Sequence, residues 1–241
     1  MFNAKNKVAL VTGATGGIGA ATVSILSECG ANVAATSRSK SLLKETSSIF
    51  PIEANFSYEK DAKHAIEQTL DRFGKIDYVA HCAGAVGSGR LDQTSLKDWN
   101  RLLEINLTST FLLCKEIYQP LKKTKGSLVL ISSVNGTHGG SEVSGIAYAT
   151  SKAGINNITR YLAKEWAKDQ IRVNCVSPGP VDTPMLDRLT AEQHAYAKAS
   201  TLLGKYSTAE ECAGLIAFLF SPWSASITGT IKNISAGIVL D

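Results

Sequence analysis

With 241 residues, 44% of them apolar, the chain is long enough to bury a hydrophobic core within a single domain. Its formal net charge of +4 comes from scattered lysines and arginines rather than from a basic run, which excludes nucleic acid as the expected partner. Its five widely spaced cysteines show no zinc-binding pattern, and no apolar stretch approaches the roughly 18 residues of a membrane span, so we expect a cytoplasmic protein with reduced thiols, no metal and no membrane partner.

Short β-branched segments alternate with longer amphipathic segments along the whole chain, which is typical of βαβ units. We predict strands at Lys7–Thr12, Asn32–Ser37, Ile49–Glu53, Ile76–Cys82, Ser127–Ser132, Arg172–Ser177 and Thr230–Ile234. We predict helices at Gly17–Cys29, Tyr58–Phe73, Leu96–Leu121, Ala147–Lys168 and Thr208–Phe220. The pattern indicates an α/β fold, a single domain over residues 1–241 with a Rossmann-type, doubly wound, parallel seven-stranded sheet. Functional residues should follow the carboxyl ends of the strands.

A glycine-rich loop, TGATGGIG at residues 12–19, joins the first strand to the first helix. Glycines let the backbone approach a phosphate closely, and the free N–H groups at a helix start can bind a pyrophosphate. Glycines at such a turn can also serve close packing alone, but the position after the first strand favours a dinucleotide. The expected cofactor contacts in this loop are Gly13, Thr15, Gly16, Gly17, Ile18 and Gly19.

The end of the second strand indicates which nucleotide binds. An acidic residue there would hydrogen-bond the ribose hydroxyls and repel a 2′-phosphate. This chain has Ser37 and Arg38 instead, a hydroxyl and a guanidinium that suit a 2′-phosphate. We therefore predict NADP(H) rather than NAD(H); the alternative is that Arg38 is an ordinary solvated side chain.

Tyr148 and Lys152 lie four residues apart and share one face of a predicted helix. The spacing alone is weak evidence, because Tyr118 and Lys122 repeat it. Only the first pair, however, follows a predicted strand with serines at its end, Ser132 and Ser133. Tyr148, Lys152 and Ser133 therefore form the candidate catalytic set.

Carbonyl reduction by hydride transfer needs this combination, because negative charge builds on an oxygen that must be held and then protonated. A phenol with a pKa of about 10 needs roughly 4 kcal/mol of preference for the phenolate to reach a pKa near 7. A neighbouring ammonium and a cationic nicotinamide can supply that preference. We expect Tyr148 to act as the general acid/base, Lys152 to lower its pKa and hold the nicotinamide ribose, and Ser133 to orient the substrate oxygen.

In these motifs and their order, the sequence resembles the short-chain dehydrogenase/reductase family over essentially the whole chain. The resemblance implies a fourth catalytic residue, Asn106, which would bind a water that links Lys152 to solvent. Without the family, an asparagine within an amphipathic helix is more often a packing or bending feature. Further cofactor contacts implied by the resemblance are Asn55, Phe56, Ala83, Gly84, Pro178, Gly179, Val181 and Thr183.

The sequence departs from the family pattern at several positions. His81 replaces an amide that usually braces the central strand, and we interpret it as a buried imidazole with hydrogen-bond partners rather than a catalytic group. Gly16 stands where many NADP-dependent members have a basic residue, so Arg38 would be the main ligand of the 2′-phosphate. The loop before Tyr148 is longer than usual, which leaves Ser132 as an alternative to Ser133.

The layout is most similar to 3-oxoacyl-[acyl-carrier-protein] reductases, which suggests a 3-oxoacyl thioester as substrate. The basic positions that dock the carrier protein in those enzymes appear here as Thr124 and Asp169, although lysines lie alongside. The alternatives are a dehydrogenase of a small ketone, sugar or other alcohol, and a non-catalytic NADP-sensing protein. Substrate shape depends on a lid at residues 185–206, and the resemblance also implies a homotetramer.

Overall fold

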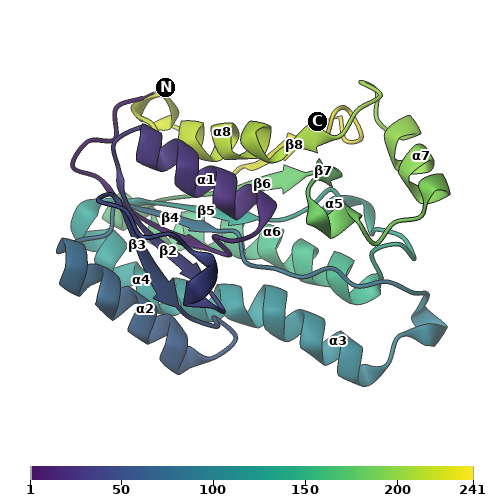
Figure 1. Ribbon diagram of the computed structural model, residues 1–241, viewed down its shortest axis with the longest axis horizontal. Coiled ribbons are helices and arrows are strands. Elements are labelled where there is room, and N and C mark those ends of the chain that lie inside the picture. The colour runs from purple at the N-terminus through teal and green to yellow at the C-terminus, as the bar shows by residue number, and fades with distance from the viewer. Residues whose placement is uncertain (1, 241) are drawn as a thin grey trace.

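One parallel β-sheet runs through the middle of the protein, of which the computed structural model describes residues 2–240. Its strands are β1 (Val8–Thr12), β2 (Asn32–Ser37), β3 (Ile49–Glu53), β4 (Tyr78–His81), β5 (Ser127–Ile131), β6 (Arg172–Pro178) and β9 (Ile231–Ile234). They are arranged in the order β3-β2-β1-β4-β5-β6-β9 (Figure 1). The order runs outward from β1 in both directions, which confirms the predicted doubly wound seven-stranded sheet. Only β4 is clearly shorter than predicted.

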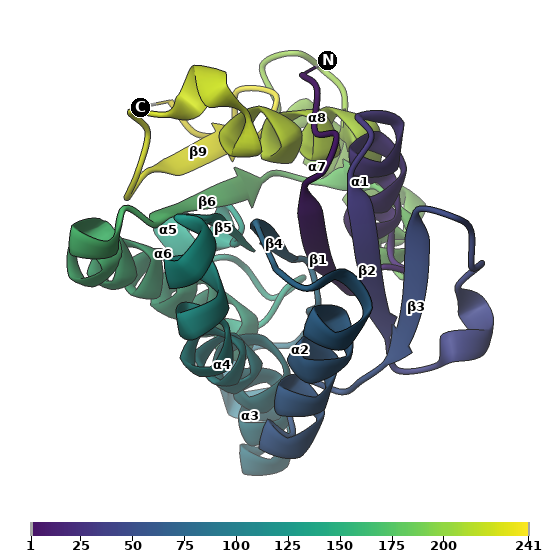
Figure 2. The ribbon, with the colours of Figure 1, turned by 90° about the vertical axis from the view of Figure 1, so that its left-hand side faces the viewer.

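Helices cover both faces of the sheet (Figure 2). Those on one face are α1 (Gly17–Glu28) and α8 (Ala209–Phe220), and those on the other are α2 (Glu59–Phe73), α4 (Ser109–Thr124) and α6 (Ile146–Trp166). Side chains of β1 alternate between the two layers, since Leu10 packs with the α2, α4 and α6 core and Val11 with the α1 and α8 core. Both faces are therefore apolar, as a parallel sheet requires.

The predicted helix Leu96–Leu121 is interrupted in the structure. Helix α3 (Leu96–Leu103) passes into a π turn at Glu104–Thr108, and α4 then continues to Thr124. A π turn inserts one extra residue per turn and is common at functional sites. Here it carries Asn106.

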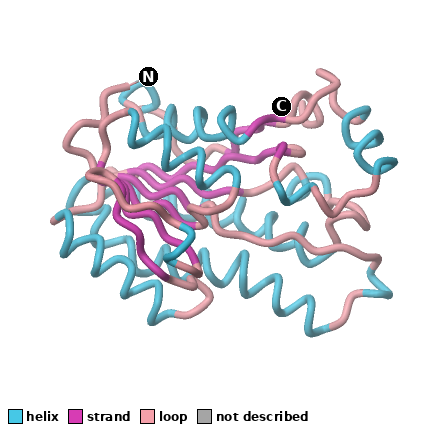
Figure 3. Tube along the Cα trace, viewed as in Figure 1, coloured by secondary structure: helices cyan, strands magenta, loops and turns pink. Residues whose placement is uncertain are grey.

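The loops that follow the strands gather at one end of the molecule, where the lid also lies (Figure 3). The lid contains a short 3-10 turn at Pro184–Leu186 and α7 (Ala191–Ala199), neither of which was expected from the sequence. Its base is closed by a small parallel pair, β7 (Val181–Asp182) with β8 (Ser207–Thr208). A further short helix, α5 (Asn135–His138), follows β5. Within the part of the chain described, no helix is long and apolar enough to cross a membrane.

Candidate active site

A large cleft lies at the carboxyl edge of the sheet and has a volume of about 1710 Å³. This exceeds the roughly 300–1,000 Å³ typical of pockets for one small molecule, so the cleft has room for a dinucleotide and a second ligand. Every predicted site residue except Asn106 lines it. Residues that lie far apart in the sequence, from the loop after the first strand to the lid, thus line the same cleft.

The glycine loop has little room for side chains. Gly13 has a φ of +64°, and a Cβ on Gly17 would lie 2.2 Å from Cγ2 of Thr183. A Cβ on Gly19 would lie 2.1 Å from the carbonyl oxygen of Gly13. Helix α1 starts at Gly17, and its N-cap residue Gly16 provides no side-chain hydrogen bond. The first N–H groups of α1 are therefore available to an anion such as a pyrophosphate. The glycines of this loop thus allow close packing and also line the cleft.

The ends of β2 and β3 form the far rim of the cleft. Arg38 is exposed there and makes no ion pair with any residue in the range 2–240. The Ser37 hydroxyl donates a hydrogen bond of 2.5 Å to the Ser39 carbonyl. Glu53 is the strand neighbour of Ser37 but does not line the cleft, and its carboxylate accepts a hydrogen bond from the Lys40 N–H. The guanidinium of Arg38 thus brings an unpaired positive charge to this rim of the cleft.

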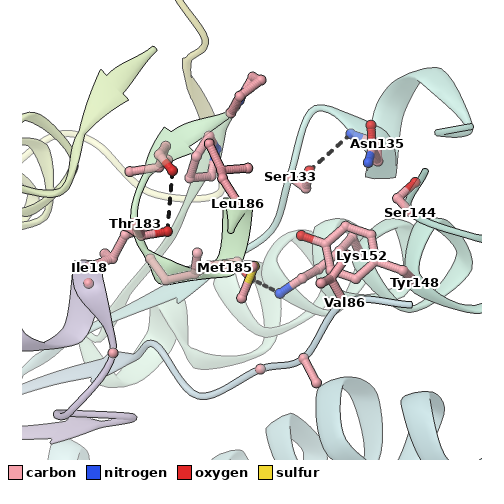
Figure 4. A pocket seen from close by; sticks show the side chains of 18 of the residues that line it. Ile18, Val86, Ser133, Asn135, Ser144, Tyr148, Lys152, Thr183, Met185 and Leu186 are labelled. Carbon is pink, nitrogen blue, oxygen red and sulfur yellow. Dashed lines mark hydrogen bonds between the residues drawn. The ribbon is translucent and has the colours of Figure 1, made fainter. Parts of the chain in front are cut away.

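Ser133, Tyr148 and Lys152 face one another in the deep part of the cleft (Figure 4). The Ser133 side chain interacts with the Tyr148 phenol and favours its ionised form. The Lys152 ammonium donates to the Ile131 carbonyl at 2.8 Å. Ser132, the alternative serine, donates instead to the backbone carbonyl of Lys152 at 2.9 Å. Ser133 is therefore the serine whose side chain contacts the tyrosine.

The ionisation of this set differs from the expectation. Burial raises the pKa of the Tyr148 phenol, while the Ser133 hydrogen bond and the positive charge of Arg188 oppose that rise. Burial also lowers the pKa of Lys152 to about 8. The protein's own side chains thus leave the phenol protonated at neutral pH, because desolvation outweighs the neighbouring charges.

Asn106 lies behind the cleft and is fully buried. Its Oδ1 accepts a hydrogen bond from the Ala85 N–H at 2.8 Å, and its Nδ2 donates to the Ala85 carbonyl and the Ser151 hydroxyl. A Cβ on Gly84 would lie 3.2 Å from Oδ1 of Asn106 and 3.5 Å from Nζ of Lys152. In this structure the amide braces the loop after β4, and the water relay remains a prediction.

His81 has the surroundings that a buried neutral imidazole needs. Its Nδ1 lies 2.8 Å from the Thr12 hydroxyl, and its Nε2 lies 3.4 Å from the Ser109 hydroxyl. Because the Ala83 N–H donates to Thr12, the Thr12 hydroxyl is free to donate to Nδ1, which puts the ring proton on Nε2. Burial and the charge of Lys152 lower the pKa of His81 to about 3. A structural role fits these contacts.

The lid forms one wall of the cleft, and the residues of the lid that line the cleft were not predicted from the sequence. Its apolar members in the cleft are Met185, Leu186, Leu189, Tyr196 and Ala197. Figure 4 shows Met185 and Leu186 across from Tyr148 and Lys152. Arg188 also lines the cleft and was missed. The only signal in the sequence was a basic residue within a segment of weak periodicity.

Comparisons with known proteins show which proteins this chain resembles. A family model described as "Enoyl-(Acyl carrier protein) reductase" matches residues 13–239. The 3-oxoacyl-[acyl-carrier-protein] reductase of Thermotoga maritima is 34% identical over 98% of this chain and 99% of its own length. A solved structure from Brucella melitensis, named as a short-chain dehydrogenase/reductase of the glucose/ribitol dehydrogenase type, is 31% identical with a TM-score of 0.94, and the match covers 100% of this chain and 99% of that one. A 3-ketoacyl-(acyl-carrier-protein) reductase from the same organism, complexed with NADH, shares the fold with a TM-score of 0.92, 24% identity and coverage of 99% and 100%.

Proposed function

The chain belongs to the short-chain dehydrogenase/reductase family, and from this premise we propose that it reduces a carbonyl with NADPH, with a 3-oxoacyl thioester as the substrate class. The coarser function, a nicotinamide-dependent oxidoreductase, follows from family membership. One observation carries the proposal: the Ser133, Tyr148 and Lys152 side chains share a cleft with the glycine loop at the start of α1.

The residues of the cleft suit carbonyl reduction. A bound NADP(H) would supply or accept the hydride. The Ser133 and Tyr148 hydroxyls hold the carbonyl oxygen as it gains negative charge, and Tyr148 then gives its proton to that oxygen. Because burial raises the pKa of Tyr148, the phenol stays protonated at neutral pH and is ready to donate. Lys152, four residues further along α6, contributes positive charge beside the tyrosine and a donor for the nicotinamide ribose.

The nucleotide preference rests on Arg38. Its guanidinium is exposed at the rim and has no ion pair among residues 2–240, so it can bind a 2′-phosphate. Glu53, the strand neighbour of Ser37, does not line the cleft, and its carboxylate accepts a hydrogen bond from the Lys40 N–H.

The thioester rests on the full-length likeness to 3-oxoacyl-[acyl-carrier-protein] reductases and on the apolar lid wall, which can contact an acyl chain. The lysines beside Thr124 and Asp169 give weaker support to the docking of an acyl carrier protein than the lid wall gives to an acyl chain. Lys122 forms an ion pair of 3.0 Å with Asp169, and the Tyr118 hydroxyl donates to the same carboxylate. Lys122 and Asp169 are thus engaged with each other, whereas Lys123, Lys125 and Lys168 are exposed.

A second candidate is a sugar or small-ketone dehydrogenase, favoured by the likeness to the Brucella melitensis protein of the glucose/ribitol dehydrogenase type. A non-catalytic NADP sensor is disfavoured, because each predicted catalytic position holds its functional side chain. Purified protein should be given NADPH or NADH with an acetoacetyl thioester, a diketone and a reducible sugar, and the loss of nicotinamide absorbance measured. Turnover of the thioester with NADPH supports the proposal, turnover of only the sugar supports the second candidate, and tight NADPH binding without turnover supports the sensor.

We also propose that the protein forms a homotetramer and works in the cytoplasm. Large apolar side chains stand exposed on α4, α6 and near the C-terminus, among them Phe111 (58% exposed), Tyr161 (64%) and Trp223 (71%). Large exposed apolar side chains of this kind can be buried in subunit contacts. All five cysteines are free thiols, which fits a reducing compartment. Light scattering of the purified protein tests the assembly, and a monomer would contradict it.

A further inference from the structure

Arg188 joins the lid to the loop that precedes the catalytic tyrosine. It lies between the 3-10 turn Pro184–Leu186 and α7, and its Nη1 donates a hydrogen bond of 2.7 Å to the Val143 carbonyl. Val143 belongs to the loop between α5 and α6, which we call the α5–α6 loop (residues 139–145). The contact therefore ties the lid to a segment of the opposite cleft wall.

The α5–α6 loop has a shape that glycines determine. Gly139, Gly140 and Gly145 have φ values of +80°, +74° and +75°, a region that other residues rarely adopt. Gly145 is also the N-cap of α6, the helix that carries Tyr148 in its first turn. The hydrogen bond from Arg188 to Val143 thus fixes the position of the lid relative to Tyr148, because only a short stretch of restricted backbone separates Val143 from Tyr148.

The charge of Arg188 reaches the tyrosine. The charged or titratable side chains that line the cleft are Arg38, Cys82, Arg101, Glu104, His138, Glu142, Tyr148, Lys152, Arg188, Glu192 and Tyr196. Burial raises the pKa of Tyr148 overall, and of these charges that of Arg188 opposes the rise. Burial lowers the pKa of Arg188 overall, and Tyr148 opposes that fall. Arg188 forms no ion pair within residues 2–240, so no carboxylate at contact distance cancels its charge.

We propose that Arg188 is a positioning residue, which docks the lid on the Val143 carbonyl and thereby brings a fixed positive charge to the oxygen of Tyr148. The proton-transfer site is then complete only when the lid is closed. This inference rests on the proposed function in taking Tyr148 as the proton donor.

The sign of the effect follows from the charge. A cation near a phenol favours the phenolate, so loss of the Arg188 charge raises the pKa of Tyr148. Oxidation of an alcohol needs the phenolate, and its acid limb should therefore move to higher pH in Arg188→Gln. Reduction of a carbonyl needs the protonated phenol, and its decline at high pH should move in the same direction.

The test uses the protein saturated with NADP⁺ and follows the near-ultraviolet absorbance of the phenolate as pH rises. Subtraction of the Tyr148→Phe protein isolates the Tyr148 signal from that of the other tyrosines. We expect Arg188→Gln to move the midpoint up by about half a pH unit or more. Arg188→Lys keeps the positive charge, so its midpoint should lie close to that of the wild type. Lys198→Gln, which removes a lysine from the same lid but from outside the cleft lining, is the matched control and should titrate like the wild type.

The outcomes separate this inference from the proposed function. A midpoint in Arg188→Gln equal to that of the wild type would overturn the inference, even if the enzyme reduces ketones well. A shift in Arg188→Gln but not in the control would support it, even if no carbonyl on the panel is reduced. Equal loss of kcat in Arg188→Gln and Arg188→Lys without any shift would show a purely mechanical contact and also overturn it. If the wild type oxidises an alcohol, the pH profile of that oxidation in Arg188→Gln should shift in the same direction as the absorbance midpoint.

Discussion

The ammonium of Lys152 lies 5.6 Å from the centre of the Tyr148 ring and is hydrogen-bonded to backbone rather than to the phenol. The two side chains are one helical turn apart on α6, so their proximity follows from the sequence. The hydrogen-bond partner of the ammonium does not follow from the helical spacing, because the Ile131 carbonyl comes from the end of β5. Lys152 is thus held beside the tyrosine by the sheet.

Replacement of Tyr148 by Phe should lower kcat for carbonyl reduction by about 10²- to 10⁴-fold, since it removes the proton donor. Affinity for NADPH should change less than about threefold, because the ring and its packing remain. Steady-state rates and fluorescence titration of NADPH measure the two effects. Tyr161→Phe alters an exposed tyrosine on the same helix and should keep full activity. Retention of activity in Tyr148→Phe would mean that another group donates the proton.

The burial of Lys152 predicts a pH-dependent stability. Its pKa is lowered from 10.5 to about 8, so at neutral pH the folded protein holds a charged, desolvated ammonium at a cost of up to about 3 kcal/mol. Between pH 8 and 10.5 the folded state loses this proton before the unfolded state does, and stability from this group rises with pH. The free energy of unfolding of Lys152→Met minus that of the wild type should therefore decrease across this window.

Urea denaturation at several pH values between neutral and alkaline measures that difference. Lys164→Met, which removes an exposed lysine of α6, is the control and should show no such trend. A difference that stays constant with pH would contradict the lowered pKa of Lys152.

Arg38→Ala should weaken the use of NADPH without harm to the use of NADH. Loss of a charge-assisted contact to a phosphate costs about 1.5–3 kcal/mol, which corresponds to roughly a 10- to 150-fold fall in kcat/KM for NADPH. Lys40→Ala, two residues further along and also exposed, should change the ratio of the two cofactors much less. An equal fall for both cofactors would instead point to a structural effect of Arg38.

Gly17→Ala should disturb the cofactor loop, because the new methyl group would lie 2.2 Å from Cγ2 of Thr183. We expect a loss of about 1–3 kcal/mol in unfolding free energy and weaker cofactor binding. Thr183→Gly in the same chain should recover part of the loss by removal of the clashing atoms. Gly214→Ala in α8 meets nothing within 4 Å and should be neutral or slightly stabilising. Thermal unfolding with and without NADPH compares the variants.

Much of the fold could be predicted from the sequence. The strands were predicted well because both faces of a parallel sheet are buried, which leaves short β-branched segments such as Val8–Thr12. The π turn at Glu104–Thr108 was missed, since a single extra residue hardly alters a helical pattern of apolar side chains. Helix α7 was missed because none of its residues is buried, so it has no apolar stripe.

The sequence by itself determined which chemical groups are present and roughly where each follows its strand or helix: a glycine loop after β1, a basic residue after β2, a serine after β5, and a tyrosine and a lysine on one helical face. Only the tertiary structure decided how those groups behave. It hydrogen-bonded the Asn106 amide to the Ala85 backbone, and it raised the pKa of Tyr148 through burial. It also placed Arg188 of the lid on the Val143 carbonyl, in the same cleft as that tyrosine, whose pKa the Arg188 charge lowers. The reason is physical: local spacing depends on the chain alone, whereas desolvation and charge coupling depend on which distant segments fill the space around a group.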